Sequence, residues 1–321
     1  MMRVIRPFVL RRGDAIGVVM PASPPTHDDL EMGIQHLEKL GFRVVLAPYA
    51  TAKNGYLAGR DSVRVQELTG MVNNPQVKAI ICARGGYGTF RILKHIDYAL
   101  FREHPKIFVG HSDITALQCA IWKRARLITL HGPMVCSDFG RPEISRFTVD
   151  HFLKMVFGQC TGELFNWRKS MQGGESLIVV QTGRAQGRLI GGNLSVLCGL
   201  IGTPWFPDLR GNLLFVEDVN EPLYRLDRMF TQLIESGSLE GVAGILGGKF
   251  AGCTSNGDED AILENVAFLM KDRFSKLRVP IVVGLPFGHV PDKLTIPFGA
   301  KAELNTRSKR LTLLEPVIVG V

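Results

Sequence analysis

Three residues of this sequence combine types and positions that could hydrolyse an acyl bond: Ser112, Glu217 and His289. A serine hydroxyl attacks a carbonyl when a histidine takes its proton and a carboxylate orients that histidine. Each of the three follows an apolar run typical of a buried strand, and ligands of parallel sheets gather beyond the carboxyl ends of the strands. The sequence therefore offers a nucleophile, an orienting acid and a base for acyl transfer.

Ser112 lies in Gly110-His-Ser-Asp113, between a predicted strand at 107–109 and a predicted helix at 114–122. A hydroxyl on such a turn stands clear of the sheet edge, where the first N–H groups of the new helix face the group that it attacks. The alternative is an N-cap serine, whose oxygen accepts a backbone N–H of the helix. This stretch alone leaves both interpretations open.

Glu217 and His289 can also be interpreted as residues without a catalytic role. Glu217 follows the predicted strand at 212–216 and could be a solvated surface acid. His289 follows the predicted strand at 281–285, in a loop with two prolines, and could be a histidine that only shapes the loop. His131, after another predicted strand, is a second candidate base, although such a histidine is more often packed.

A glycine-rich loop, Arg84-Gly-Gly-Tyr-Gly88, follows the predicted strand at 77–83 and is expected at the same sheet edge as Ser112. Successive glycines let the backbone approach a ligand and turn its N–H groups outward, although a tight turn alone could also require them. The loop lacks the third glycine of a dinucleotide fingerprint. We therefore predict no nucleotide cofactor.

The order of predicted elements indicates an α/β fold. In the first half, strands are predicted at 15–20, 42–47, 77–83, 107–109 and 128–130, and helices at 28–40, 60–71, 88–95 and 114–122. In the second half, strands are predicted at 212–216, 242–246 and 281–285, helices at 193–201, 221–234 and 258–270, and a hairpin from 294–304 and 310–314. Strands that alternate with helices predict right-handed crossovers and a parallel sheet.

The 321 residues exceed the usual size of one domain, so we expect two. The poorly periodic stretch 158–187 is the predicted junction between a first domain at 1–157 and a second at 188–321.

Composition narrows the class of partner. The formal net charge of +8 favours anionic ligands, but the basic residues are scattered without interleaved aromatics, which argues against a nucleic-acid groove. The sequence has no apolar run of membrane-spanning length and no signal-peptide core, and its six cysteines form no CxxC pair. We predict a cytoplasmic protein that binds neither nucleic acid nor membrane.

Taken together, the motifs resemble those of the LD-carboxypeptidase family, serine peptidases that trim cell-wall peptides and include the microcin C immunity proteins. The resemblance runs nearly end to end. It rests on Arg84-Gly-Gly-Tyr-Gly88, Gly110-His-Ser-Asp113, Leu189-Ile-Gly-Gly-Asn193, Phe215-Val-Glu-Asp218, Glu221-Pro-Leu-Tyr-Arg-Leu-Asp-Arg228, Gly288-His289 and Leu294-Thr-Ile-Pro-Phe-Gly299.

The resemblance implies a flavodoxin-like N-terminal domain that carries Ser112 and a smaller, β-rich α/β C-terminal domain that carries Glu217 and His289, with the active site between them. It implies Ser112 as nucleophile, His289 as general base and acid, and Glu217 as orienting carboxylate. The implied oxyanion hole consists of the backbone N–H groups of Asp113 and one glycine of the 85–86 pair, of which we favour Gly86. The family is similar in needing no cofactor or metal and in being commonly homodimeric.

The implied reaction releases the terminal D-alanine from cytoplasmic murein tetrapeptides, by cleavage of an LD bond, in cell-wall recycling. Such a substrate carries several carboxylates, and Arg84, Tyr87 and Arg225 are its expected contacts. One alternative is a microcin-immunity-type peptidase that cleaves aminoacyl-nucleotide analogues, with Trp167 as the candidate to stack on the base. Another is a two-domain protein that binds a small ligand without catalysis.

Overall fold

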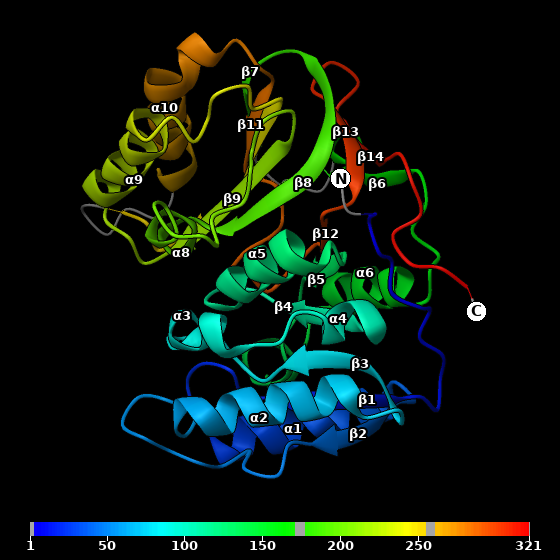
Figure 1. Ribbon diagram of the computed structural model, residues 1–321. Coiled ribbons are helices and arrows are strands. Elements are labelled where there is room, and N and C mark those ends of the chain that lie inside the picture. The colour runs from blue at the N-terminus through cyan, green and yellow to red at the C-terminus, as the bar shows by residue number, and fades with distance from the viewer. Residues whose placement is uncertain (1–2, 171–176, 255–260, 321) are drawn as a thin grey trace. The chain divides into compact units, whose positions relative to one another are not determined.

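The computed structural model describes residues 3–170, 177–254 and 261–320, which form two compact units (Figure 1). The first unit comprises Met1–Gln159, Pro291–Pro297 and Val317–Val321, and the second comprises Cys160–Val290 and Phe298–Pro316. Each unit has its own sheet. The predicted α/β class, with a parallel sheet in the N-terminal part and a second sheet in a separate domain, is confirmed.

The sheet of the first unit has the strand order β12-β5-β4-β3-β1-β2. Its strands are β1 (Ala15–Val19), β2 (Arg43–Leu46), β3 (Val77–Cys82), β4 (Ile107–Gly110), β5 (Thr129–His131) and β12 (Ile296–Phe298). Strands β1 to β5 pair in parallel, in the order 2-1-3-4-5 of flavodoxin-like folds. This topology places the loops after β3 and β4 side by side, because these strands are neighbours.

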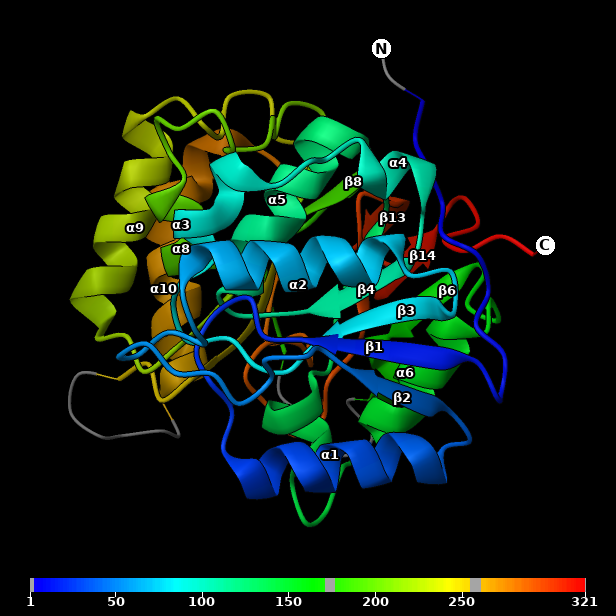
Figure 2. The ribbon, with the colours of Figure 1, turned by 60° about the horizontal axis from the view of Figure 1, so that its bottom comes forward.

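The helices of the first unit are α1 (His27–Lys39), α2 (Asp61–Asn73), α3 (Thr89–Ile92), α4 (Leu100–Glu103), α5 (Ile114–Ala125) and α6 (Arg146–Val156), with short helical turns at Leu93–His95 and Val135–Phe139. Figure 2 shows α1 and α2 on opposite faces of the sheet. Helix α1 buries Leu30 and Leu37 on one face, and its N-cap, Thr26, accepts a hydrogen bond from Asp29 N. Helical periodicity and local capping therefore explain why these crossovers were predictable.

The sheet of the second unit has the order β6-β14-β13-β8-β9-β10-β11-β7. Its strands are β6 (Glu163–Asn166), β7 (Ile178–Gln181), β8 (Arg184–Asn193), β9 (Leu213–Val219), β10 (Gly244–Ala251), β11 (Ile281–Val283), β13 (Lys301–Asn305) and β14 (Arg310–Leu313). Its helices are α7 (Trp167–Ser170), α8 (Leu194–Gly199), α9 (Leu223–Glu235) and α10 (Ile262–Phe274), with a short turn at Ser275–Leu277. Strands β8 to β11 pair in parallel, so β9 lies inside the sheet.

The structure differs from two predictions about the second half of the chain. The chain passes from the first unit to the second between Gln159 and Cys160, at the start of the predicted junction at 158–187. The described residues of that stretch, however, contribute β6, β7 and the start of β8 to the second sheet. Gly191 belongs to β8, where a Cβ would lie 1.8 Å from the carbonyl oxygen of Phe215, so this glycine permits close pairing of β8 with β9. The segment 294–304 is not one hairpin arm, because β12 joins the first sheet and only β13 and β14 form the hairpin.

Candidate functional site

Ser112 occupies a strained turn between β4 and α5. Its φ of +61° places it in the left-handed region, which costs a residue with a Cβ roughly 1–2 kcal/mol. The N-cap of α5 is Asp113, which makes no side-chain capping bond. The N-cap interpretation of Ser112 is therefore wrong. The strain instead presents its hydroxyl at the carboxyl end of β4, which is the geometry of a nucleophile elbow.

Gly85 lies directly against this turn. A Cβ on Gly85 would be 2.7 Å from Ser112 Oγ and 3.3 Å from Asp113 N. The carbonyl of Gly85 accepts a hydrogen bond from Ser23 N (3.2 Å). In a trans peptide the C=O and the N–H of the next residue point in opposite directions, so the N–H of Gly86 points away from Ser23 N. In the part of the chain that the structure describes, the N–H groups of Gly86 and Asp113 have no acceptor. An oxyanion hole requires free N–H donors close to the attacking hydroxyl, and the N–H groups of Asp113 and Gly86 remain the expected donors.

We expect Gly85→Ala to lower kcat by about 10²- to 10³-fold, because the new methyl group would displace the Ser112 hydroxyl and the neighbouring donors. The matched control is Gly70→Ala in α2, where a Cβ meets no atom within 4 Å. Steady-state kinetics of the two variants check this prediction. Equal kcat values for them would contradict it.

Asp113 connects the Ser112 turn to the glycine-rich loop. Its carboxylate accepts a hydrogen bond from Thr89 N (2.9 Å), and Thr89 Oγ1 donates to the Asp113 carbonyl (2.8 Å). Burial raises the pKa of Asp113 to about 6, although the bonds from Thr89 oppose this shift. The same residue thus supplies a backbone donor next to Ser112 and joins the two loops through its side chain.

The raised pKa of Asp113 predicts a pH dependence of stability. Between the ordinary value of 3.8 and about 6, the folded state keeps a proton that the unfolded state has lost, so stability falls as the pH rises. The expected contribution of Asp113 to this fall is roughly 1.4 kcal/mol per pH unit. Asp113→Asn should lower the slope by this amount, since an asparagine oxygen still accepts from Thr89 but carries no charge. Part of the wild-type slope should remain, because burial also raises the pKa of Asp218 to about 6.

Urea unfolding at pH 4, 5 and 6 measures the slope for the wild type, for Asp113→Asn and for the exposed control Asp97→Asn. The wild-type slope should persist in Asp97→Asn. If the free energy of unfolding of Asp113→Asn falls with pH as steeply as that of the wild type, ionisation of the Asp113 carboxyl does not oppose folding.

Glu217 and His289 contact each other within the second unit. Glu217 lies inside β9 with none of its surface exposed, and its Oε2 is 2.8 Å from His289 Nδ1. Gly288, with φ of +108°, allows this approach, because a Cβ there would lie 2.7 Å from Glu217 Oε2. The interpretation of Glu217 as a solvated surface acid is wrong. With Nδ1 engaged by the carboxylate, Nε2 of His289 is the nitrogen that can exchange a proton with a substrate.

Asp218, next to Glu217, was missed by the sequence analysis. Its carboxylate accepts from Asn193 Nδ2 and Ser195 N, each at 2.9 Å. Burial, and to a smaller extent the neighbouring Glu217, raises its pKa to about 6. These bonds join the end of β9 to the end of β8 and the start of α8, and so support the strand that carries Glu217. The acidic pair in Phe215-Val-Glu-Asp218 was the available signal.

His131 is fully buried in the first unit, where its ring lies edge-on to that of His111 at 5.9 Å. A histidine without exposed surface is poorly suited to exchange protons with a substrate. The structure therefore favours packing for His131.

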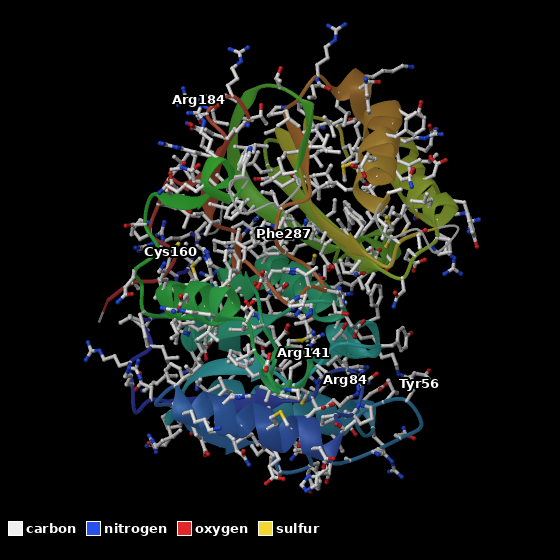
Figure 3. The ribbon with its side chains drawn as sticks, turned by 180° about the vertical axis from the view of Figure 1, so that it is seen from behind. Tyr56, Arg84, Arg141, Cys160, Arg184 and Phe287 are labelled. Carbon is white, nitrogen blue, oxygen red and sulfur yellow. The ribbon has the colours of Figure 1, made fainter. Side chains whose placement is uncertain are left out.

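The three predicted substrate contacts differ in their surroundings. Arg84, labelled in Figure 3, is half-buried and donates to a backbone carbonyl at 3.4 Å. Tyr87 is exposed, and its ring lies 5.8 Å from that of Tyr56. Both belong to the first unit. Arg225 belongs to the second unit and pairs at 3.2 Å with a glutamate one turn earlier on the chain. Arg84 and Tyr87 flank the glycines beside Ser112, whereas the charge of Arg225 already has a partner.

Trp167, the predicted base-stacking residue, is only 1% exposed. A side chain with so little accessible surface offers no face to a nucleobase. Across residues 3–170, 177–254 and 261–320, no cluster of three or more histidine, cysteine, aspartate or glutamate side chains could hold a metal ion. Within the same ranges, every helix is too short or too polar to cross a bilayer.

Family models match most of the chain. The model of the LD-carboxypeptidase N-terminal domain matches residues 16–132, and that of the LD-carboxypeptidase C-terminal domain matches residues 186–304. The probable murein peptide carboxypeptidase of Bacillus subtilis (strain 168) is 40% identical, over 98% of this chain and 96% of its own length.

Solved structures are similar over nearly the whole chain. The crystal structure of muramoyltetrapeptide carboxypeptidase from Oxalobacter formigenes is 33% identical, with a TM-score of 0.77, and the match covers 93% of this chain and 97% of that one. A structure of the microcin C7 self-immunity protein MccF with aspartyl sulfamoyl adenosine is 26% identical, with a TM-score of 0.87, over 98% and 100% of the two chains. The MccF sequence from Escherichia coli is 27% identical over 94% of each chain.

Proposed function

The chain belongs to the LD-carboxypeptidase family, and we propose that it releases the terminal D-alanine from murein tetrapeptides by hydrolysing the bond between an L-centre and a D-residue. The observation that carries this proposal is the 40% identity, over nearly the full length of both chains, with a protein named as a murein peptide carboxypeptidase. The strained turn at Ser112 and the hydrogen bond between Glu217 and His289 support a serine mechanism.

In the proposed first step, Ser112 Oγ attacks the scissile carbonyl while Nε2 of His289 takes the hydroxyl proton. Glu217 holds Nδ1 of the imidazole and stabilises the positive charge that forms on the ring. The N–H groups of Asp113 and Gly86 stabilise the negative charge on the carbonyl oxygen. Ser112 belongs to the first unit and the Glu217–His289 pair to the second, so their approach is itself part of the proposal.

Collapse of the tetrahedral intermediate breaks the C–N bond, and His289 gives its proton to the leaving amine of D-alanine. Water then attacks the acyl-serine ester while His289 takes a proton from it. The bond between the acyl carbon and Ser112 Oγ breaks, His289 returns the proton to Oγ, and the shortened peptide leaves with a new carboxylate. No cofactor or metal enters this scheme. On the basis of the resemblance we also propose that the protein works as a homodimer in the cytoplasm.

Charge supports the proposed substrate class. A murein tetrapeptide carries several carboxylates, and the net charge of +8 favours its approach. We propose that the guanidinium of Arg84, the first residue of the glycine-rich loop, binds one of these carboxylates. Arg225 is the weaker candidate, because its guanidinium already pairs with Glu221.

A second candidate is hydrolysis of an aminoacyl-nucleotide analogue, which the likeness to the MccF complex with aspartyl sulfamoyl adenosine favours. Burial of Trp167 counts against it, because that side chain was the expected stacking platform.

Incubation of the protein with tetrapeptides that contain meso-diaminopimelate or lysine, and separately with aspartyl sulfamoyl adenosine, tests the two candidates. We expect D-alanine from a tetrapeptide, no cleavage of a pentapeptide control that ends in D-Ala-D-Ala, and an unchanged nucleotide analogue. Consumption of the analogue alone would favour the immunity-type activity. Binding of the tetrapeptide without any product would favour a non-catalytic binding protein.

A further inference from the structure

A buried charged cluster lies next to the Ser112 turn and has no part in the proposed mechanism. Lys293 is 1% exposed, and its Nζ lies 2.6 Å from Asp138 Oδ1 and 3.1 Å from His111 Nε2. His111 is buried as well and immediately precedes Ser112 in the sequence. All of these residues belong to the first unit.

The hydrogen-bond partners indicate which atoms of this cluster carry protons. His111 Nδ1 lies 3.2 Å from the carbonyl of Gly132, which can only accept, and we therefore assign the proton of the neutral imidazole to Nδ1. Nδ1 also lies 3.5 Å from Lys293 Nζ and 3.8 Å from Asp138 Oδ2. With that assignment, Nε2 has a free lone pair and accepts a hydrogen bond from the Lys293 ammonium. The positive charge of Lys293 is balanced by the carboxylate of Asp138. Asp138 also accepts from Met134 N at 2.8 Å. A neutral imidazole between an ion pair and a backbone carbonyl fixes the residue next to Ser112.

The chain around Lys293 is held just as firmly. Lys293 N donates to Thr148 Oγ1 (2.7 Å), and Thr148 Oγ1 donates to the Pro291 carbonyl (2.6 Å). The Ser145 hydroxyl, at the start of α6, donates to Asp292. The first turn of α6 therefore clamps the short segment 291–293 within the first unit.

The clamped segment lies close in sequence to His289, the proposed base. His289, bonded to Glu217, precedes Lys293 by only four residues, and four residues span at most about 14 Å. The segment 289–293 therefore begins at the proposed base, His289. It ends at Lys293, which contacts His111, the residue before the proposed nucleophile.

We propose that Lys293 is a positioning residue, which anchors the chain behind His289 to the turn that carries Ser112. This inference rests on the proposed function. It adds that the proton transfer between Ser112 and His289 depends on the length of the 289–293 segment and on the contact of Lys293 with His111 and Asp138. A buried ion pair that served stability alone would not affect the turnover of folded protein.

Two variants test the anchor. Lys293→Met combined with Asp138→Asn removes both buried charges together, so no unpaired charge is left, and asparagine can still accept from Met134 N. A single glycine inserted between Val290 and Pro291 lengthens the segment and leaves every side chain of the cluster unchanged. In both variants we expect kcat to fall by about 100-fold, with KM within about threefold of wild type.

The controls are Lys106→Met, at the opposite end of β4, and a glycine inserted between Ser308 and Lys309 in the turn from β13 to β14. Lys106 bonds to the carbonyls of Met71 and Asn74 and contacts neither Ser112 nor His111, so both controls should keep wild-type kcat. Melting temperatures of all variants establish that they are folded. A folded cluster variant or segment insertion whose kcat falls by less than tenfold would overturn the proposal.

The labelling rate of Ser112 by a fluorophosphonate separates this inference from the proposed function, since labelling requires an activated serine but no knowledge of the substrate. If wild type labels rapidly but releases no D-alanine, the proposed substrate is wrong, and the labelling rates then test the anchor. We expect both test variants to label about 100-fold more slowly than wild type. Equal labelling rates would overturn the role of Lys293 whatever the substrate is.

Discussion

Ser112→Ala is expected to lower D-alanine release by about 10⁴- to 10⁶-fold, the range that follows loss of the nucleophile in serine hydrolases. Alanine keeps the Cβ at the left-handed backbone position, so the turn and its strain are retained while the attacking oxygen is lost. The donors at Asp113 and Gly86 remain in place. Tetrapeptide affinity should therefore stay within about threefold of wild type.

Single-turnover assays and isothermal titration calorimetry measure the two quantities separately. The matched control is Ser62→Ala on the exposed face of α2, which should behave as wild type in both assays. A fluorophosphonate should label wild type and Ser62→Ala but not Ser112→Ala. D-alanine release by Ser112→Ala at more than about a hundredth of the wild-type rate would rule out a serine mechanism at this position.

The parallel sheet of the first unit was predictable, because its elements follow local rules. Buried strands such as β1 are continuous apolar runs, and α1 shows a clear apolar stripe with a capping threonine. Strand β8 was missed because its first half alternates in burial while Gly191 and Gly192 suggest a turn. A glycine is required at 191 because Phe215 of the neighbouring strand lies very close to it. The local sequence does not reveal which strand that neighbour is.

The candidate residues were recognisable where they end an apolar run: Ser112 comes shortly after β4, and Glu217 lies within β9 after its apolar first half. Which backbone atoms of the glycine pair face Ser112 depends on the bond from Ser23 to Gly85, which joins two separate loops. The Lys293 cluster was missed for a similar reason, since its members lie at 111, 138 and 293. A lysine close to the apolar run Leu294-Thr-Ile296 was the available signal.

Glu217→Gln is expected to lower kcat by about 10³- to 10⁴-fold, with a much smaller change in KM. Glutamine has the size of glutamate, so the interior of β9 should repack little. Its amide can donate to His289 Nδ1 where the carboxylate can only accept. That bond would hold the proton on Nε2, the nitrogen that must accept the Ser112 proton, and the imidazolium would lose the negative charge that stabilises it.

The matched control is Glu303→Gln, a carboxylate in the same unit that pairs with Arg184 at 2.8 Å and lies on β13. It should keep wild-type kcat, although loss of an exposed ion pair costs it up to about 1 kcal/mol of stability. Steady-state kinetics with a tetrapeptide, together with thermal unfolding of both variants, separate catalysis from folding. If folded Glu217→Gln keeps kcat within tenfold of wild type, the hydrogen bond to His289 orients a loop and not a base.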